Sequence, residues 1–195
     1  MRSFQPLAAK RLSGTVLVAR PAPPKSVTAE SPALDAMTDL RYIHAAIIEP
    51  QQTMEAAHAY MMQRGVRLLL VLGPERTLAG IITATDILGE KPLHFAQERR
   101  VKHSDILVSD IMTPLDQLEA VPIDDLRSAR VGQVIAFLRE AGRQHALVKE
   151  SDSAGRIIVR GIYSLTQIER QMGLAIQPSG VANTFAEIEA TLLTS

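Results

Sequence analysis

A threonine and an aspartate follow an apolar run in the middle of the chain, at a spacing that suits a helix cap or a ligand site. Residues 80–86 are Gly-Ile-Ile-Thr-Ala-Thr-Asp, which predicts a buried strand that turns directly into a helix. Thr83 and Asp86 have the spacing of a capping box, which satisfies backbone N–H groups at a helix start. The same carboxylate could accept two hydrogen bonds from the vicinal hydroxyls of a ribose, and the helix start could face an anion. Both interpretations stay open at this point.

Composition excludes several other kinds of chemistry. The 195 residues include 21 basic and 21 acidic side chains and no cysteine. Binding to nucleic acid or to an anionic membrane needs a positive surplus, which this charge balance does not supply. The lack of cysteine removes disulfides, thiolate catalysis and cysteine-based zinc sites. The longest apolar runs are too short to cross a bilayer, so we expect a soluble, cytoplasmic protein.

The elements that must position Thr83 can be placed from the pattern around it. Residues 68–72 are wholly apolar and predict a buried strand, and residues 78–82 are its expected hairpin partner. Residues 53–64 carry methionines and alanines at helical spacing, and Gly65 stands where a helix C-cap belongs. Residues 42–48 predict one further strand, which Pro50 follows.

The same order of elements returns in the second half of the chain. Asp-Ile-Met-Thr at residues 110–113 repeats Asp-Ala-Met-Thr at 35–38, and residues 161–167 repeat residues 80–86. Between them, residues 128–139 predict an amphipathic helix and residues 145–148 a strand. Each unit is therefore expected to run strand–helix–strand–strand–helix. Because a unit of roughly 60 residues buries little surface alone, we expect the two units to pack together.

Three segments lie outside the repeat. Residues 1–33 are rich in proline, serine and alanine and are expected to form an extended arm. The connector, residues 93–107, carries a charged run at 98–103, which we interpret as solvent-exposed, with a phosphate-facing patch as the alternative. Residues 175–195 predict a C-terminal amphipathic helix that packs on the body or on a second subunit.

Catalytic and metal-binding motifs do not occur in the sequence. It has no H-E-x-x-H, no G-x-S-x-G, no phosphate-binding G-x-x-x-x-G-K-[ST] loop and no G-x-G-x-x-G. The acidic pair Asp124-Asp125 is interpreted as a helix start, where carboxylates are favourable. We therefore expect neither an enzyme nor a metal site.

A duplicated unit with D-x-M-T near its start and G-h-h-[ST]-x-x-[DQ] at its end, where h is an apolar residue, resembles a pair of CBS (cystathionine-β-synthase-type) domains, together a Bateman module. The resemblance places the two repeats at residues 34–92 and 108–174. It implies a mixed α/β (α+β) fold, with two β-α-β-β-α repeats packed about a pseudo-twofold axis. It also implies a non-catalytic regulatory module and homodimer that binds AMP, ADP, ATP or S-adenosylmethionine between the repeats and signals to a protein partner.

The resemblance also assigns residues. Asp86 matches the ribose-binding acid of the family, and Thr83 matches a hydroxyl that contacts phosphate or ribose. Gln167 stands where the second repeat should have its acid, which removes a charge-assisted acceptor, so we expect one competent site. His145 lies where the family has a basic residue facing phosphate, although a lone histidine at a strand start is more often structural. The candidate binding residues are Thr83, Asp86, Thr85, Ser164, His145 and Arg67.

Two other functions remain as hypotheses. The amide at Gln167 and the apolar Leu68 at the position equivalent to His145 would also suit a structural interaction module with degenerate nucleotide sites. Nucleic-acid binding is supported only by the basic cluster at residues 99–103, and we expect no nucleic-acid or membrane partner.

Overall fold

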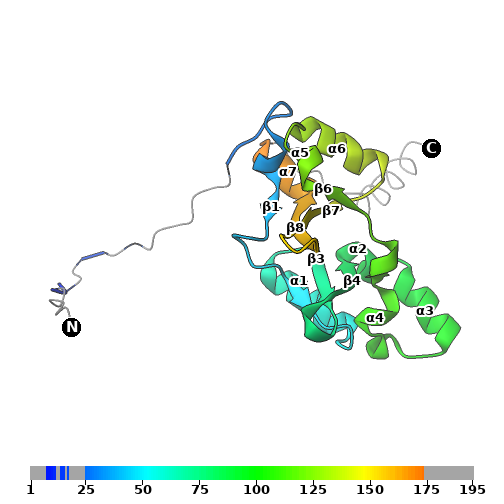
Figure 1. Cartoon of the computed structure of the whole chain (residues 1–195). Coiled ribbons are helices and arrows are strands. Elements are labelled where there is room, and N and C mark those ends of the chain that lie inside the picture. The colour runs from blue at the N-terminus through cyan, green and yellow to red at the C-terminus, as the bar shows by residue number, and fades with distance from the viewer. Residues whose placement is uncertain (1–7, 12–13, 16, 18–24, 174–195) are drawn as a thin grey trace, which may run out of the picture.

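The structure is a computed structural model that describes residues 8–11, 14–15, 17 and 25–173. There the chain forms two four-stranded sheets with helices packed on them, which appear in Figure 1 as an upper and a lower half. The mixed α/β fold class expected from the sequence is confirmed. The predicted C-terminal helix, residues 175–195, lies outside the described residues, as does most of the first part of the predicted arm.

The lower half contains the first sheet, with strand order β2-β3-β4-β5. Its strands are β2 (Ile47–Ile48), β3 (Leu68–Leu72), β4 (Leu78–Thr83) and β5 (Thr113–Pro114). Its helices are α1 (Met54–Arg64), α2 (Ala84–Leu88), α3 (Lys91–Arg99) and α4 (Val108–Ile111), with 3-10 turns η2 (Pro74–Arg76), η3 (His103–Asp105) and η4 (Leu115–Gln117). The predicted helix after Thr53 and the predicted β3–β4 hairpin are both present.

The upper half contains the second sheet, with strand order β1-β8-β7-β6. Its strands are β1 (Thr38–Asp39), β6 (Ala120–Pro122), β7 (His145–Ser151) and β8 (Ile157–Ser164). Its helices are α5 (Ile123–Leu126), α6 (Val131–Glu140) and α7 (Leu165–Gln171), preceded in the chain by the 3-10 turn η1 (Ala33–Ala36).

The two repeats exchange two short strands, β1 and β5. β1 comes before the whole first sheet in the sequence, yet it pairs with β8, where Thr38 lies opposite Ile162. In the same way β5 follows the first repeat and pairs with β4, where Pro114 lies opposite Gly80. Each D-x-M-T segment therefore completes the sheet of the other repeat. A reciprocal exchange of this kind is the relation that a pseudo-twofold axis produces.

The apolar run in β3 is explained by burial on both of its faces. Leu69 and Val71 pack into a core with Met54 and Met61 of α1, whereas Met62 is exposed. Leu68 and Leu70 alternate with them and pack with Leu147 of β7 in a cluster that joins the two sheets. A strand buried on both faces needs continuous rather than alternating apolar residues. Because β3 contributes to both clusters, it connects the helix layer to the contact between the halves.

The strand predicted at residues 42–48 is a turn and a loop over most of its length. Only Ile47 and Ile48 pair in the sheet, and Tyr42 and Ile43 are exposed. The backbone N–H groups of both donate to the carbonyl of Asp39, and the Asp39 carboxylate accepts from Arg41 N at 2.9 Å. The prediction was wrong because the chain must leave the second sheet after β1 and enter the first, which requires a bend where the sequence is apolar.

The second predicted helix starts three residues later than expected, at Val131. The preceding residues are extended because they pair with the N-terminal segment: Ala33 N donates to Ala129 O and Val131 N to Ser31 O, both at 2.9 Å. Residues 25–33, the last part of the predicted arm, thus pack on the second repeat, with Val27 buried in its core. The connector also contains a helix, α3, that the sequence analysis did not predict.

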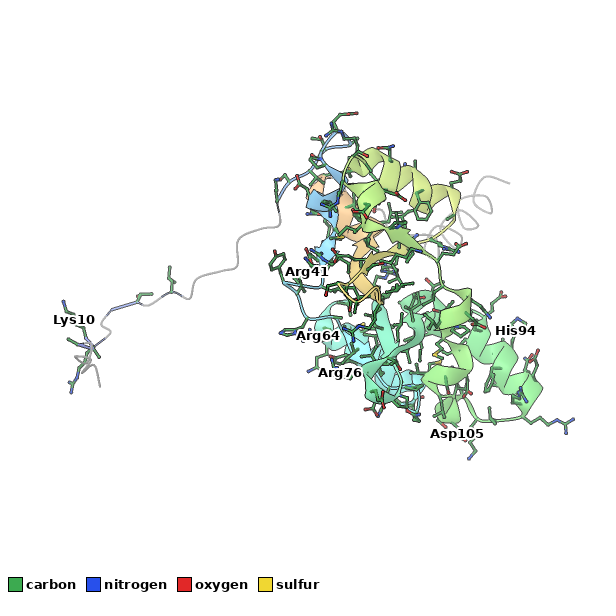
Figure 2. The ribbon with its side chains drawn as sticks, in the orientation of Figure 1. Lys10, Arg41, Arg64, Arg76, His94 and Asp105 are labelled. Carbon is green, nitrogen blue, oxygen red and sulfur yellow. The ribbon has the colours of Figure 1, made fainter. Side chains whose placement is uncertain are left out.

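Buried charges attach β1 to its sheet. The Arg160 side chain on β8 is only 10% exposed and forms ion pairs with Asp39 of β1 and Glu150 of β7. Arg41, labelled in Figure 2, donates a further 2.7 Å hydrogen bond to Glu150. Because a buried charge without a partner is strongly destabilising, this arrangement favours the exchanged position of β1.

Two equivalent glycines make the exchange possible. A Cβ at Gly80 would collide with the carbonyl oxygen of Thr113 and lie 3.1 Å from Pro114 Cα, both backbone atoms of β5. A Cβ at Gly161 would collide instead with the side chain of Met37. Each glycine therefore lies where the exchanged segment of the other repeat crosses the sheet.

We expect Gly80→Ala to lower the free energy of unfolding by about 2–3 kcal/mol, because overpacking against backbone forces a strand to move. Gly161→Ala should cost about 1 kcal/mol, since the Met37 side chain can adopt another rotamer. Urea unfolding of the two variants beside the wild type measures both losses. Equal losses would show that the backbone crossing at β5 is not the tighter of the two.

Candidate functional site

The predicted capping box at the start of α2 is present. Thr83 Oγ1 accepts from Asp86 N at 3.3 Å, and Asp86 Oδ2 accepts from Thr83 N at 2.8 Å and from the Thr83 hydroxyl at 2.6 Å. This arrangement holds the Asp86 carboxylate against the end of β4. The Asp86 side chain is only 11% exposed, so a carboxylate that could have served as a surface cap is largely enclosed.

Lys91, the first residue of α3, also contacts this carboxylate. Its Nζ forms an ion pair with Asp86 Oδ1 and lies 3.4 Å from the carbonyl oxygen of Ile111. Lys91 was not predicted from the sequence, because a lysine five residues after the acid belongs to no recognised motif. The only sequence signal was its position just beyond the end of α2.

Asp86 faces a cavity of about 510 Å³ between the two halves. The first repeat lines it with Thr83, Thr85 and Asp86. The second lines it with residues just before β6 and with residues before and at the start of β7. The second repeat's lining residues include Leu118, Glu119, Arg143, Gln144 and His145. Three residues predicted from the first repeat thus meet one predicted from the second, as expected for a site built by duplication.

Arg67 lies beside this cavity. A neighbouring hollow of about 280 Å³ is lined by Arg67, Thr85 and His145, so it continues the cavity past the start of α2. Arg143, which lines the main cavity, forms an ion pair with Glu119 at 2.8 Å. Arg67 is therefore a stronger candidate for an anion contact than its position beside an apolar strand suggested.

His145 is neutral at physiological pH. Burial and, to a smaller extent, the nearby positive charge of Arg67 together lower the pKa of its imidazole to about 4. A neutral imidazole can donate one hydrogen bond to a phosphate oxygen, but it brings no charge. The positive charge next to Thr85 therefore comes from Arg67, which lines the same hollow.

No group of three or more histidine, aspartate or glutamate side chains suited to a metal ion occurs among the residues that the structure describes. Within the same part of the chain, no helix combines the length and apolar character needed to span a membrane.

Comparison with known proteins identifies the architecture. Residues 35–92 match the family model of the CBS domain. An uncharacterized conserved protein from Pyrococcus horikoshii has a similar structure, with a TM-score of 0.54 and 20% identity over 78% of this chain and 100% of its own. CBSX2 from Arabidopsis thaliana, solved in complex with AMP, has a TM-score of 0.51 and 21% identity over 72% of this chain and 94% of its own. The CBS-domain protein ATU1752 from Agrobacterium tumefaciens has a TM-score of 0.50 and 15% identity over 70% of this chain and 93% of its own. A search of curated proteins finds no match.

The first repeat thus matches the CBS domain, and the described chain has the fold of these structures. Its two repeats offer different chemistry at equivalent places. Ser164 Oγ accepts from Gln167 N at 3.5 Å, and the Gln167 side chain accepts from the Thr38 hydroxyl at 3.1 Å. Ser164 is not among the residues that line the Asp86 cavity. It lies opposite His145 in the β7–β8 pair, outside the cavity lining.

We expect His145 to make the stability of the chain depend on pH. Its pKa is about 4 in the folded chain and about 6.5 in the unfolded chain, so the unfolded state binds the proton first as pH falls. The stability that comes from a neutral His145 is fully present above pH 6.5. The free energy of unfolding then falls by about 1–3 kcal/mol between pH 6.5 and 4, allowing for partial solvent screening.

Urea unfolding at several pH values measures this slope in the wild type and in His145→Gln. The glutamine variant should lose the part of the slope between pH 4 and 6.5, whereas His94→Gln, on the exposed side of α3, should keep it. An unchanged profile in His145→Gln would contradict a buried, neutral imidazole at this position.

Proposed function

We propose that this chain is a CBS pair, a non-catalytic regulatory module that binds an adenosine-containing nucleotide in the Asp86 cavity. The observation that carries the proposal is the position of the Asp86 carboxylate, which is enclosed between the two repeats and faces a cavity large enough for a nucleoside. Occupancy would change how the halves, or two copies of the chain in a homodimer, pack together. A protein partner in the cytoplasm would then sense that change.

A ribose in this cavity would place its vicinal hydroxyls at Asp86 and Thr83. A carboxylate has about four acceptor positions, and Thr83 N, the Thr83 hydroxyl and Lys91 already use three of them. A nucleoside would therefore bond to the remaining position and to the threonine hydroxyl, or would displace Lys91. The adenine ring would lie toward the apolar wall that includes Leu118 and Leu147.

The phosphate side of the site is modest in charge. Thr85, His145 and Arg67 line the adjoining hollow, and His145 is neutral. This favours AMP over ADP and ATP, whose additional phosphates would need more than one cation close by. The complex of CBSX2 with AMP supports the class of ligand. S-adenosylmethionine, with its positive sulfonium, remains the alternative adenosine compound.

A structural interaction module is the second candidate function. Two observations favour it: Lys91 already contacts Asp86, and Thr38 already holds the amide of Gln167. In that case both helix caps serve the fold alone, and the chain would act through its surface. The two functions differ in whether any adenosine compound binds.

Titration calorimetry with AMP, ADP, ATP and S-adenosylmethionine tests the proposal. We expect wild-type protein to bind at one site and Asp86→Asn to bind about 10- to 100-fold more weakly, because the amide loses charge-assisted hydrogen bonds. Asp124→Asn is the matched control, since it removes an exposed acid at another helix start and should leave affinity unchanged.

A thermal melt must show that Asp86→Asn is folded under the titration conditions. No heat with any of the four compounds at millimolar concentration would reject the sensor and favour the structural module. Equal affinity in wild type and folded Asp86→Asn would also reject the proposed site.

A further inference from the structure

Lys91 connects the candidate site to the connector between the repeats. Its Nζ contacts Asp86 of α2 and the carbonyl of Ile111, the last residue of α4. Only two residues, Gly89 and Glu90, separate α2 from α3. A single side chain thus joins the carboxylate of the site to the first turn of α3 and to the segment that leads into β5.

The two members of this ion pair differ in exposure. The Asp86 side chain is 11% exposed, whereas the Lys91 side chain is 50% exposed. The carboxylate accepts two hydrogen bonds from Thr83 within the capping box, whereas Lys91 is held at its Nζ. Because the lysine can regain hydration when it leaves, Lys91 is the member that an incoming ligand would displace.

A hollow beside α3 offers Lys91 another position. This hollow, of about 670 Å³, is lined by Lys91 itself and by the acids Asp86, Glu90, Glu98 and Asp110. Glu90 approaches His94 at 3.7 Å, and the Asp110 carboxylate accepts from Leu107 N. Figure 2 shows His94 on α3 at the outer side of the molecule. When the Lys91 ammonium group leaves Asp86, it can therefore approach Glu98 and Asp110, which line the same hollow.

We propose that Lys91 is an internal competitor for Asp86, which a bound nucleoside displaces, and that its displacement loosens the first turn of α3. This inference rests on the proposed function, because it requires a ligand with hydroxyl donors at Asp86. The hydroxyls take the Oδ1 position that Lys91 holds in the ligand-free protein. The connector then reports occupancy of the site to whatever contacts α3.

The size of this effect follows from linkage. A ligand can shift α3 only by the free energy with which it and Lys91 exclude each other, and the coupling is the same in both directions. Removing the lysine should therefore strengthen ligand binding. Since the lysine of this ion pair is half exposed, its removal should raise the affinity for the ligand by about three- to tenfold.

The experiment uses the full chain with AMP as the probe. Calorimetry compares the wild type with Lys91→Met, with Lys91→Gln and with the control Lys102→Met, which removes an exposed lysine of the same connector. Both Lys91 variants should bind AMP about three- to tenfold more tightly, and the control should match the wild type. Hydrogen exchange of the His94 amide, which donates to Glu90 O in the first turn of α3, should increase on AMP binding in the wild type. In Lys91→Met it should be fast already and unchanged by AMP.

The outcomes separate this inference from the proposed function. Equal AMP affinity in the wild type and both Lys91 variants would overturn the competitor but leave the nucleotide site. Weaker binding in the variants would also overturn it, because Lys91 would then be a ligand contact. Exchange at α3 that does not respond to AMP in the wild type would do the same. Absence of AMP binding in every variant would reject both.

Discussion

The exchange of β1 and β5 between the repeats is the constraint on which the rest of this structure depends. Each sheet is completed by a two-residue strand from the other repeat, so neither repeat alone contains all the strands of its sheet. The apolar cluster that contains Leu68, Leu70 and Leu147 lies where the two sheets meet. The cavity at Asp86 is at the same junction, because β5 and the chain after it bring Leu118 and Glu119 against the first repeat. The candidate site is therefore a consequence of the exchange.

A symmetric backbone here carries an asymmetric set of side chains. Thr83 and Ser164 both cap a helix with a hydroxyl, which is all that the fold requires at those positions. Asp86 and Gln167 differ in charge, and so do the environments that they meet: Lys91 in one case and the Thr38 hydroxyl in the other. A helix cap tolerates either an acid or an amide. Duplication could thus preserve the architecture while the chemistry of the two places diverged.

The parts of the structure that could be predicted are those decided by neighbours in the sequence. The capping box at Thr83, the left-handed Gly65 after α1 and the apolar hairpin of β3 and β4 all follow from local preferences and periodicity. The internal repeat added the expectation that residues of both halves would meet, and Thr85, Asp86 and His145 do line one cavity.

The remaining features depend on contacts between distant segments. The turn at residues 42–48 is required by the crossing from one sheet to the other, and the late start of α6 by pairing with residues 31–33. Lys91 was missed for the same reason, since a lysine in a connector has no periodic signature. The neutrality of His145 depends on burial and on Arg67, neither of which can be obtained from the residue types alone.

The position of β1 also sets an order in which the chain can fold during synthesis. The first sheet has all four of its strands once residue 114 has left the ribosome, but β1 pairs with residues 161–162. Until those residues emerge, Val27, Ala33 and Ala36 lack the core in which they are finally buried. Residues 27–39, although made early, are therefore among the last to reach their native contacts. A nascent chain must carry this apolar segment in contact with solvent or a chaperone while nearly the whole of the second repeat is made.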